Sequence, residues 1–271
     1  MFLENVKPFG GYEPGPREVP IGTLLTRRKL TDRDGKSARM VQVRLADTEG
    51  VRNRASMLLN RMYSWRGYGA EHSLEDDGSS VTFTASTKDE VIGTLTLTVD
   101  SRAGLAIDKT FSDELDPFRS NPGSRICELT KFAFNPSPES RPVLATLFHI
   151  IFMYGSHRYN CTDLFIEVNP RHVRFYEVML AFQRIGGLRQ NDTVGAPSQL
   201  MWIKVADIRS YIDLYAGREN YSGHSLYPHF FSRKEEDGLF ARITRLAEKR
   251  LDPVQTARKQ PHQSRQLQAA H

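Results

Sequence analysis

Residues 125–135 read Arg-Ile-Cys-Glu-Leu-Thr-Lys-Phe-Ala-Phe-Asn, and this stretch decides the fold because it sets one carboxylate inside an apolar strand. The pattern predicts a strand over 126–134, whose alternation puts Glu128 on the face opposite Cys127 and Lys131. Burial among apolar neighbours raises a carboxyl pKa toward the range of a general base. A glutamate paired with a flanking cation is the alternative, and on spacing alone it is the commoner outcome.

A second stretch, Asp163-Leu-Phe-Ile-Glu-Val-Asn-Pro170, predicts a strand that leads into a capped helix. Asn169 suits the N-cap and Pro170 the first helical position, and the helix is expected to reach Phe182. Groups at such a junction lie at the carboxyl edge of the sheet, where α/β proteins usually bind ligands. Tyr176 lies two turns into the helix, where its hydroxyl can protonate a leaving thiolate. On spacing alone a core tyrosine is the commoner outcome.

The rest of the chain alternates between strand and helix patterns. Apolar alternation predicts strands over 41–45, 81–85, 91–99 and 201–205, with an extension of the sheet over 104–107. Helical spacing predicts helices over 48–63, 143–157 and 205–216, and Gly186-Gly187 is expected to end the segment after the second stretch. This order predicts an α/β domain with helices on the faces of a sheet.

Composition describes a globular chain, because 39% hydrophobic and 25% charged residues among 271 are enough to bury a core. The longest apolar run, residues 143–154, is shorter than the about 20 residues that span a bilayer. The N-terminus lacks the apolar stretch of a signal peptide. Two cysteines without a CxxC motif favour a reduced, cytoplasmic setting.

Positive charge is concentrated at the C-terminus. Residues 241–271 hold seven Lys/Arg against Glu248 and Asp252, which accounts for the net charge of +5 of the whole chain. We therefore expect an irregular arm over 1–20, a folded domain over 21–240, and a basic helix with a disordered tail after it. Such a tail can touch an anionic membrane surface peripherally, although a solvated tail is commoner. We expect no nucleic acid partner.

Together the two stretches resemble the GNAT superfamily of acyltransferases. The segment CELTKFAFNP (127–136) is similar to its glutamate-bearing fourth strand, and FIEVNPRHVRFYEVMLAF (165–182) to its fifth strand and following helix. Within the superfamily the chain resembles the FeeM-type long-chain N-acyl amino acid synthases, and more distantly the acyl-homoserine-lactone synthases. The resemblance extends loosely over 20–235. It implies a central mixed, mostly antiparallel sheet flanked by helices.

The resemblance also implies an activity: transfer of a long-chain fatty acyl group from an acyl carrier protein thioester to the amino group of an amino acid. Glu128 would take a proton from the amine, and Tyr176 would protonate the departing thiol. A backbone amide of Phe132 or Ala133 would stabilise the oxyanion. We expect no permanently bound cofactor and no metal, since the histidines show no metal-ligand spacing.

Three further groups of residues are candidates for binding. The cations and polar groups that could hold the acceptor's carboxylate are Lys131, Arg125, Arg171 and Asn169. The apolar residues that could line an acyl pocket are Leu147, Ile150, Ile151, Phe165, Phe175 and Met179. Acyl carrier proteins are acidic, and the basic residues that could dock one are Arg52, Arg54 and Arg61, with Arg27, Arg28 and Lys29. Plain core and a solvated helix face are the structural alternatives.

Two departures from related patterns bear on the rival functions. Acyl-coenzyme A enzymes of this fold usually hold the pyrophosphate on a glycine-rich loop before a helix. Residues 136–142 read Pro-Ser-Pro-Glu-Ser-Arg-Pro, which argues against a coenzyme A-dependent N-acetyltransferase and favours a carrier protein over acyl-coenzyme A as donor. Lys131 stands where acyl-homoserine-lactone synthases typically have arginine. The third alternative is a non-catalytic sensor that binds a lipid or partner, against which Glu128 and Tyr176 together argue.

Overall fold

The computed structural model describes residues 22–31, 38–69, 72–74, 80–87, 90–136, 140–218 and 222–256. The predicted arm over 1–20 and the tail beyond 256 lie outside the described residues. The middle of the glycine-free linker, residues 137–139, lies outside them too.

One eight-stranded sheet runs through the described part of the chain, in the order β1-β2-β3-β4-β5-β6-β8-β7. Neighbouring strands are antiparallel except β5 and β6, which are parallel. The mixed, mostly antiparallel sheet expected from the sequence is therefore confirmed. The strands are β1 (Leu24–Thr31), β2 (Ala38–Leu45), β3 (Ser80–Thr87), β4 (Glu90–Val99), β5 (Ile126–Phe134), β6 (Asp163–Val168), β7 (Gln183–Asn191) and β8 (Ala196–Lys204).

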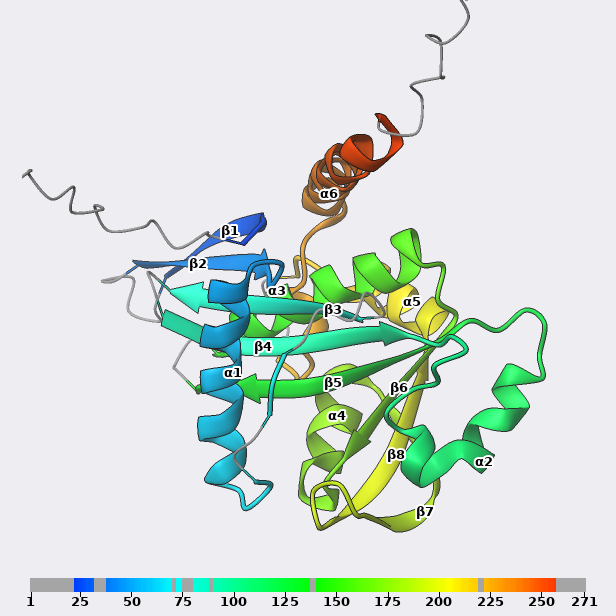
Figure 1. The fold of residues 1–271 in the computed structure, drawn as a ribbon. Coiled ribbons are helices and arrows are strands. Elements are labelled where there is room, and N and C mark those ends of the chain that lie inside the picture. The colour runs from blue at the N-terminus through cyan, green and yellow to red at the C-terminus, as the bar shows by residue number, and fades with distance from the viewer. Residues whose placement is uncertain are drawn as a thin grey trace, which may run out of the picture.

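Helices cover both faces of this sheet (Figure 1). α1 packs across β4 and β5 on one face, and α2 lies on the same face, while α3 and α5 pack on the opposite face. The helices are α1 (Glu49–Ser64), α2 (Asp108–Arg119), α3 (Ser140–Met153), α4 (Val173–Leu180), α5 (Val205–Tyr215) and α6 (Arg233–Thr256). Shorter helical turns are η1 (Tyr154–Arg158), η2 (Pro170–His172) and η3 (Tyr227–His229).

The parallel pair β5–β6 opens the sheet at its centre. The two strands are paired only from Ile126 with Asp163 to Leu129 with Ile166, whereas β5 continues to Phe134. Beyond these positions the strands diverge, and α4 lies beside the opening (Figure 1). The opening brings the carboxyl half of β5 and the start of α4 to one region of the molecule.

Both motif stretches and most of the other predicted elements are confirmed. α4 ends at Leu180 rather than Phe182, because Ala181 adopts the left-handed conformation with φ of 62°. The strand predicted from residue 201 begins earlier, at Ala196. The predicted boundary at residues 240–241 falls inside α6.

Three elements differ from the sequence-based expectation. The strand expected over 104–107 is wrong: this segment turns into α2, in which Ile107, Phe111 and Leu115 follow at helical spacing and are buried. Gly186-Gly187 does not end the segment but lies within β7, where Gly186 (φ 63°) takes up a register shift. β1 is an edge strand rich in basic residues, which hide its strand pattern.

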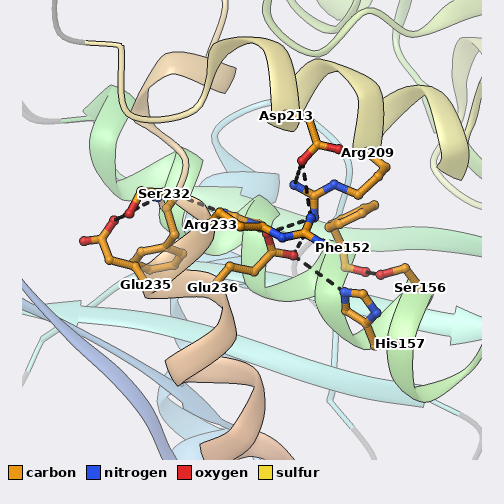
Figure 2. Close-up of polar contacts among 11 residues, drawn as sticks. Phe152, Ser156, His157, Arg209, Asp213, Ser232, Arg233, Glu235 and Glu236 are labelled. Atoms are coloured by element: carbon orange, nitrogen blue, oxygen red, sulfur yellow. Dashed lines mark hydrogen bonds and ion pairs between the residues drawn. The ribbon is translucent and has the colours of Figure 1, made fainter.

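A buried ion-pair network fastens the start of α6 to the body of the protein (Figure 2). Arg209 of α5 donates to both carboxylate oxygens of Glu236, at 2.6 and 2.8 Å, and also pairs with Asp213 at 2.8 Å. The Nε2 atoms of His149 and His157 lie 3.7 and 3.6 Å from the Glu236 carboxylate. Burial opposes ionisation there, yet the interactions with His149 and Arg209 lower the pKa of Glu236 to about 2.

Among the helices of the described part of the chain, none combines the length and the apolar character needed to cross a bilayer.

Candidate functional site

β5 separates two chemically different surfaces. Its register pairs Glu128 with Thr98 of β4 and with Phe165 of β6, so these three side chains share the face covered by α1 and α2. Cys127 pairs with Leu164 and lies on the opposite face. The alternation predicted for Cys127 and Glu128 is therefore confirmed.

Glu128 is only 1% exposed and lies beneath the start of α2. Its Oε1 accepts a hydrogen bond from the amide of Ala106 at 2.7 Å, and its Oε2 accepts one from the amide of Ile107 at 3.1 Å. These partners are backbone amides, not the flanking cations Arg125 and Lys131. Burial raises the pKa of Glu128 to about 7, against the effect of the two amides. Such a carboxyl can both accept and release a proton near neutral pH.

A β-bulge interrupts β5 shortly after Glu128. Between Thr130 and Ala133 this strand carries one residue more than β4, and Lys131 adopts φ of 53° there. A bulge leaves its extra residue outside the ladder. The amides of Phe132 and Ala133, predicted to bind the oxyanion, therefore lie at an interruption of the ladder, and their role stays a prediction.

Tyr176 is a buried phenol on α4. Its ring packs edge-on against Phe175 and Phe182, with centroids 5.1 and 5.9 Å away. Burial, reinforced by the nearby Tyr63, raises the pKa of the Tyr176 hydroxyl well above its usual value of 10. The phenol therefore stays protonated at physiological pH, and burial makes it a weaker acid than a solvated tyrosine.

Tyr63 connects Tyr176 with the face that carries Glu128. It lies at the end of α1, which packs over Ala133, and the register places Ala133 on the same face as Glu128. Burial raises the pKa of Tyr63 to about 12. No described hydrogen bond joins Glu128 to Tyr176 directly, so the assignment of this pair as base and acid stays a prediction.

An apolar cavity of about 30 Å³ lies on the opposite face, between β5, β6, α3 and α5. Phe148, Ile151, Leu180 and Phe182 are among its walls. Because Phe182 also touches the Tyr176 ring, the cavity lies next to the phenol.

The residues predicted to line an acyl pocket are only partly brought together. Ile151 lines the cavity, Leu147 and Ile150 are fully buried in the same core, and Phe175 and Met179 pack against that core. Phe165 is separated from them, because strand alternation places it on the Glu128 face, in a cluster with Phe111 and Leu200.

Lys131 and Arg171 contact one segment, the residues after α1, which we call the strap (65–69 and 72–74). The Lys131 Nζ donates to the carbonyl oxygen of Ser73 at 3.2 Å, and the Arg171 Nη2 donates to the hydroxyl of Tyr68 at 2.6 Å. Arg125 precedes β5, at the other end of the strand from Lys131. The structure thus brings two of the three predicted cations together.

The start of α4 is capped as predicted. The side-chain oxygen of Asn169 accepts the amide of Arg171 at 3.2 Å, which commits that oxygen to the cap. His172 lies next to Arg171, and burial, with the charges of Arg171 and Arg66, lowers the pKa of His172. A neutral imidazole at this position is expected at physiological pH.

The predicted docking cations are scattered. Burial, together with the charges of Arg27 and Arg54, lowers the pKa of Arg44, a residue that the sequence analysis did not single out. Arg61 pairs with Glu90 at 4.0 Å. Arg28 points away from them toward α3, where it donates to Thr146 and to a backbone carbonyl.

Two features of the site were not found from the sequence. Tyr63 and Tyr68 belong to the run Tyr-Ser-Trp-Arg-Gly-Tyr-Gly over 63–69, whose aromatic and cationic content was the available signal.

Within the described residues, no group of three or more His, Cys, Asp or Glu side chains is placed to hold a metal ion.

Comparison with known proteins supplies an independent result. The family model described as N-acyl amino acid synthase FeeM matches residues 54–204. Among solved structures, FeeM, an N-acyl amino acid synthase from uncultured soil microbes, shares 25% identity at a TM-score of 0.54, over 68% of this chain and 96% of that one. The AHL synthase LasI shares 16% identity at a TM-score of 0.44, over 62% of this chain and 90% of that one. No curated protein sequence matches the chain.

Proposed function

This chain belongs to the N-acyl amino acid synthase FeeM family, and from that premise we propose that it moves a long-chain fatty acyl group from an acyl carrier protein to the amino group of an amino acid. The chain is an N-acyltransferase with the GNAT fold. The observation that supports the proposed chemistry best is Glu128, a buried carboxyl whose pKa is raised to about 7.

Glu128 takes a proton from the ammonium group of the acceptor, directly or through a water molecule. An α-amino group has a pKa near 8 and a free glutamate one near 4.3, so transfer to a solvated glutamate is uphill by roughly 5 kcal/mol. With the Glu128 pKa near 7 the gap falls to about one unit, or about 1.4 kcal/mol. Burial thus makes this carboxylate a competent base.

The freed amine attacks the thioester carbonyl, and the negative charge that develops on its oxygen needs donors. The bulge in β5 offers the amides of Phe132 and Ala133 for this role, typically worth about 3 kcal/mol. Tyr176 then gives its proton to the departing thiolate. Nitrogen loses two protons as the ammonium group becomes an amide. Glu128 takes the first and later releases it to solvent, and the second replaces the proton that Tyr176 gives to the thiolate.

The acyl chain needs an apolar path, and the cavity beside Phe182 supplies its start. About 30 Å³ is far too small for a long chain, so the walls must move apart as the chain enters. Aromatic walls such as Phe148 and Phe152 can turn without exposing a polar group.

Two observations support a carrier protein as donor: the sequence of the linker before α3 and a group of positive charges. The linker over 136–142 has no glycine, and its three prolines leave few amides for the pyrophosphate of coenzyme A. The positive charges of Arg27 and Arg54 both act on Arg44, and such a group of cations would attract an acidic carrier protein.

Expression of the chain in a bacterium, followed by mass spectrometry of lipid extracts, tests the proposal. New N-acyl amino acids are expected, and they should vanish with Glu128→Gln while the variant still accumulates as folded protein. A cyclised homoserine product would point to the acyl-homoserine-lactone reaction instead. An extract without new amides, from cells that contain soluble protein and acyl carrier protein, would contradict the proposal.

A further inference from the structure

We propose that the strap and the start of α4 form the subsite that binds the acceptor's carboxylate, with the guanidinium groups of Arg171 and Arg66 as its ligands and Tyr68 as a positioning residue. This inference rests on the proposed function, because it assigns the part of the acceptor that does not react. It adds Arg66 and Tyr68 to the residues that the sequence indicated.

Arg171 is oriented by two neighbours and still has donors to spare. Its Nε donates to the Nε2 of His172 at 3.3 Å, and its Nη2 donates to the Tyr68 hydroxyl at 2.6 Å. The guanidinium also lies over the Tyr68 ring, 5.4 Å from the centroid. These contacts fix its plane and leave Nη1 uncommitted among the described residues, so it can face a carboxylate.

Arg66 adds a second positive charge at the same place. Its Nη1 donates to the carbonyl oxygen of Met62 at 2.9 Å, and its guanidinium lies 5.3 Å from the centroid of the Trp65 ring. Arg66 lies two residues before Tyr68, the residue to which Arg171 donates. Consistent with this placement, burial and the charges of Arg171 and Arg66 lower the pKa of His172.

The positive charge has no counter-ion in the described part of the chain. Arg66, Arg171 and Lys131 are bonded only to carbonyl and hydroxyl oxygens and to one ring nitrogen. Several arginines elsewhere are paired with carboxylates, as Arg119 is with Asp108. Guanidinium groups that lie over aromatic rings and have no carboxylate partner among the described residues suit an anionic ligand.

The location suits an acceptor. The Tyr63 ring packs edge-on against Tyr68, with centroids 5.8 Å apart, and Tyr63 interacts electrostatically with Tyr176. The strap is held in place by α1, because the Asn60 side chain accepts the amide of His72 at 2.7 Å and the Ser56 hydroxyl accepts that of Leu74 at 3.1 Å. The cations therefore sit on a fixed support one tyrosine away from the proposed acid.

The test compares acceptors with and without a carboxylate. Purified enzyme with acyl-acyl carrier protein is assayed on phenylalanine against 2-phenylethylamine, and on leucine against 3-methylbutylamine. The wild type is expected to prefer the amino acid in kcat/KM, and Arg171→Gln with Arg66→Gln to lower this preference about 10- to 100-fold. Tyr68→Phe should raise KM for the amino acid and leave kcat near its original value. Arg174→Gln, an exposed arginine of α4, is the matched control and should keep the preference.

The outcomes separate this inference from the proposed function. If the wild type forms N-acyl amino acids but the double variant keeps the preference, the carboxylate subsite is wrong and the proposed function stands. If instead the variant raises KM for the donor, and an acyl-pantetheine without phosphate removes the difference, the cations bind the donor's phosphate and the inference is overturned. Ligand-observed NMR with phenylalanine and no donor covers the case in which no product forms: binding lost in the double variant supports the subsite, and equal or absent binding overturns it.

Discussion

At the scale of single residues, Glu128 combines two tasks that a surface glutamate could not perform. Its carboxylate holds the amides of Ala106 and Ile107 at the turn before α2, while burial raises its pKa to about 7. The amides keep the carboxylate oriented, and the lack of water makes it basic. The same residue therefore orders this turn and has the basicity that the proposed role of proton acceptor requires.

The rate should depend on pH through this carboxyl. Since the base must be ionised, kcat/KM is expected to rise with pH and to level off above an apparent pKa near 7. If the rise in kcat/KM reports Glu128, its apparent pKa stays the same when the acceptor is replaced by one with a different amine pKa, for example an amino acid by its amide. If the apparent pKa shifts with the amine, the titrating group belongs to the substrate instead.

Tyr176→Phe removes the proposed acid without changing the packing of the ring. We expect kcat to fall by about 10²-fold, while the KM values change little. Since the hydroxyl is buried, the thermal stability of the variant should be measured beside the rate. A variant with full activity would mean that the thiolate leaves without this proton.

At the scale of elements, α6 is fixed to the body by one buried carboxylate. Glu236 is contacted by Arg209 of α5, by His149 of α3 and by His157 of the turn that follows. Removal of one partner from a buried ion pair leaves an uncompensated charge, and such changes cost several kcal/mol. The attachment of α6 therefore depends on the ionisation of this network.

This attachment predicts an acid-sensitive stability. The pKa of Glu236 is lowered from 4.5 to about 2, so its contribution is complete above pH 4.5 and is lost as the pH falls toward 2. The linkage amounts to roughly 3 kcal/mol in the free energy of unfolding. Urea unfolding at pH 5 and pH 3 measures it, and Glu236→Gln should lack this part of the pH dependence. An equal pH dependence in both proteins would contradict the prediction.

Element prediction from the sequence succeeded where pattern and burial agree. β6 and the start of α4 could be predicted because an apolar run ends at Asn169-Pro170, a local signal that the fold respects. α2 could not, because its helical stripe of Ile107, Phe111 and Leu115 is set among charged residues and continues past Pro117. β7 could not be predicted, because a pair of glycines usually ends a helix or strand, whereas here the pair lies within the strand at a register shift.

The site followed the same rule. Glu128 and Tyr176 could be singled out because each lies in a stretch with a local pattern and a family likeness. The Arg66–Tyr68–Arg171 grouping could not, since it joins residues about 100 positions apart through the tertiary fold. Strand alternation along β6 is enough to predict that Phe165 faces away from Leu164, and therefore away from the other residues predicted to line an acyl pocket.

At the scale of the whole molecule, the two faces of the sheet carry residues that we propose for different parts of the acyl transfer. Glu128 and the strap lie on the side of α1, whereas Tyr176 packs in the core on the side of α3 and α5, next to the apolar cavity. The strands β5 and β6 diverge beyond their paired residues, and α4 lies beside their diverging ends (Figure 1). In the proposed reaction, a thioester bound between these strands would place its acyl chain toward the apolar cavity and its carbonyl toward the face of Glu128.

Gly155 offers a direct test of this arrangement. It lines the cavity, and a Cβ built on it meets nothing within 4 Å. Gly155→Leu should fill the cavity and shift the products toward shorter acyl chains, as measured by mass spectrometry. Gly238→Leu on the exposed side of α6 is the matched control, because its Cβ also meets nothing within 4 Å. An unchanged chain-length profile in a folded Gly155→Leu variant would place the acyl chain elsewhere.

The short parallel junction also has a consequence for how the chain assembles. β1 to β5 form a meander of antiparallel neighbours that pair with the next strand in sequence, whereas the second half joins through only four rungs between β5 and β6. Loop-closure entropy delays such distant pairing, since α3 must first bring β6 back. We infer that the meander gains structure first, and that the seam at Ile126–Leu129 closes late. Pulsed hydrogen exchange during refolding should then protect the amides of β3 and β4 before those of β6 and β8, so that the junction of β5 and β6 is the last part of the sheet to be completed.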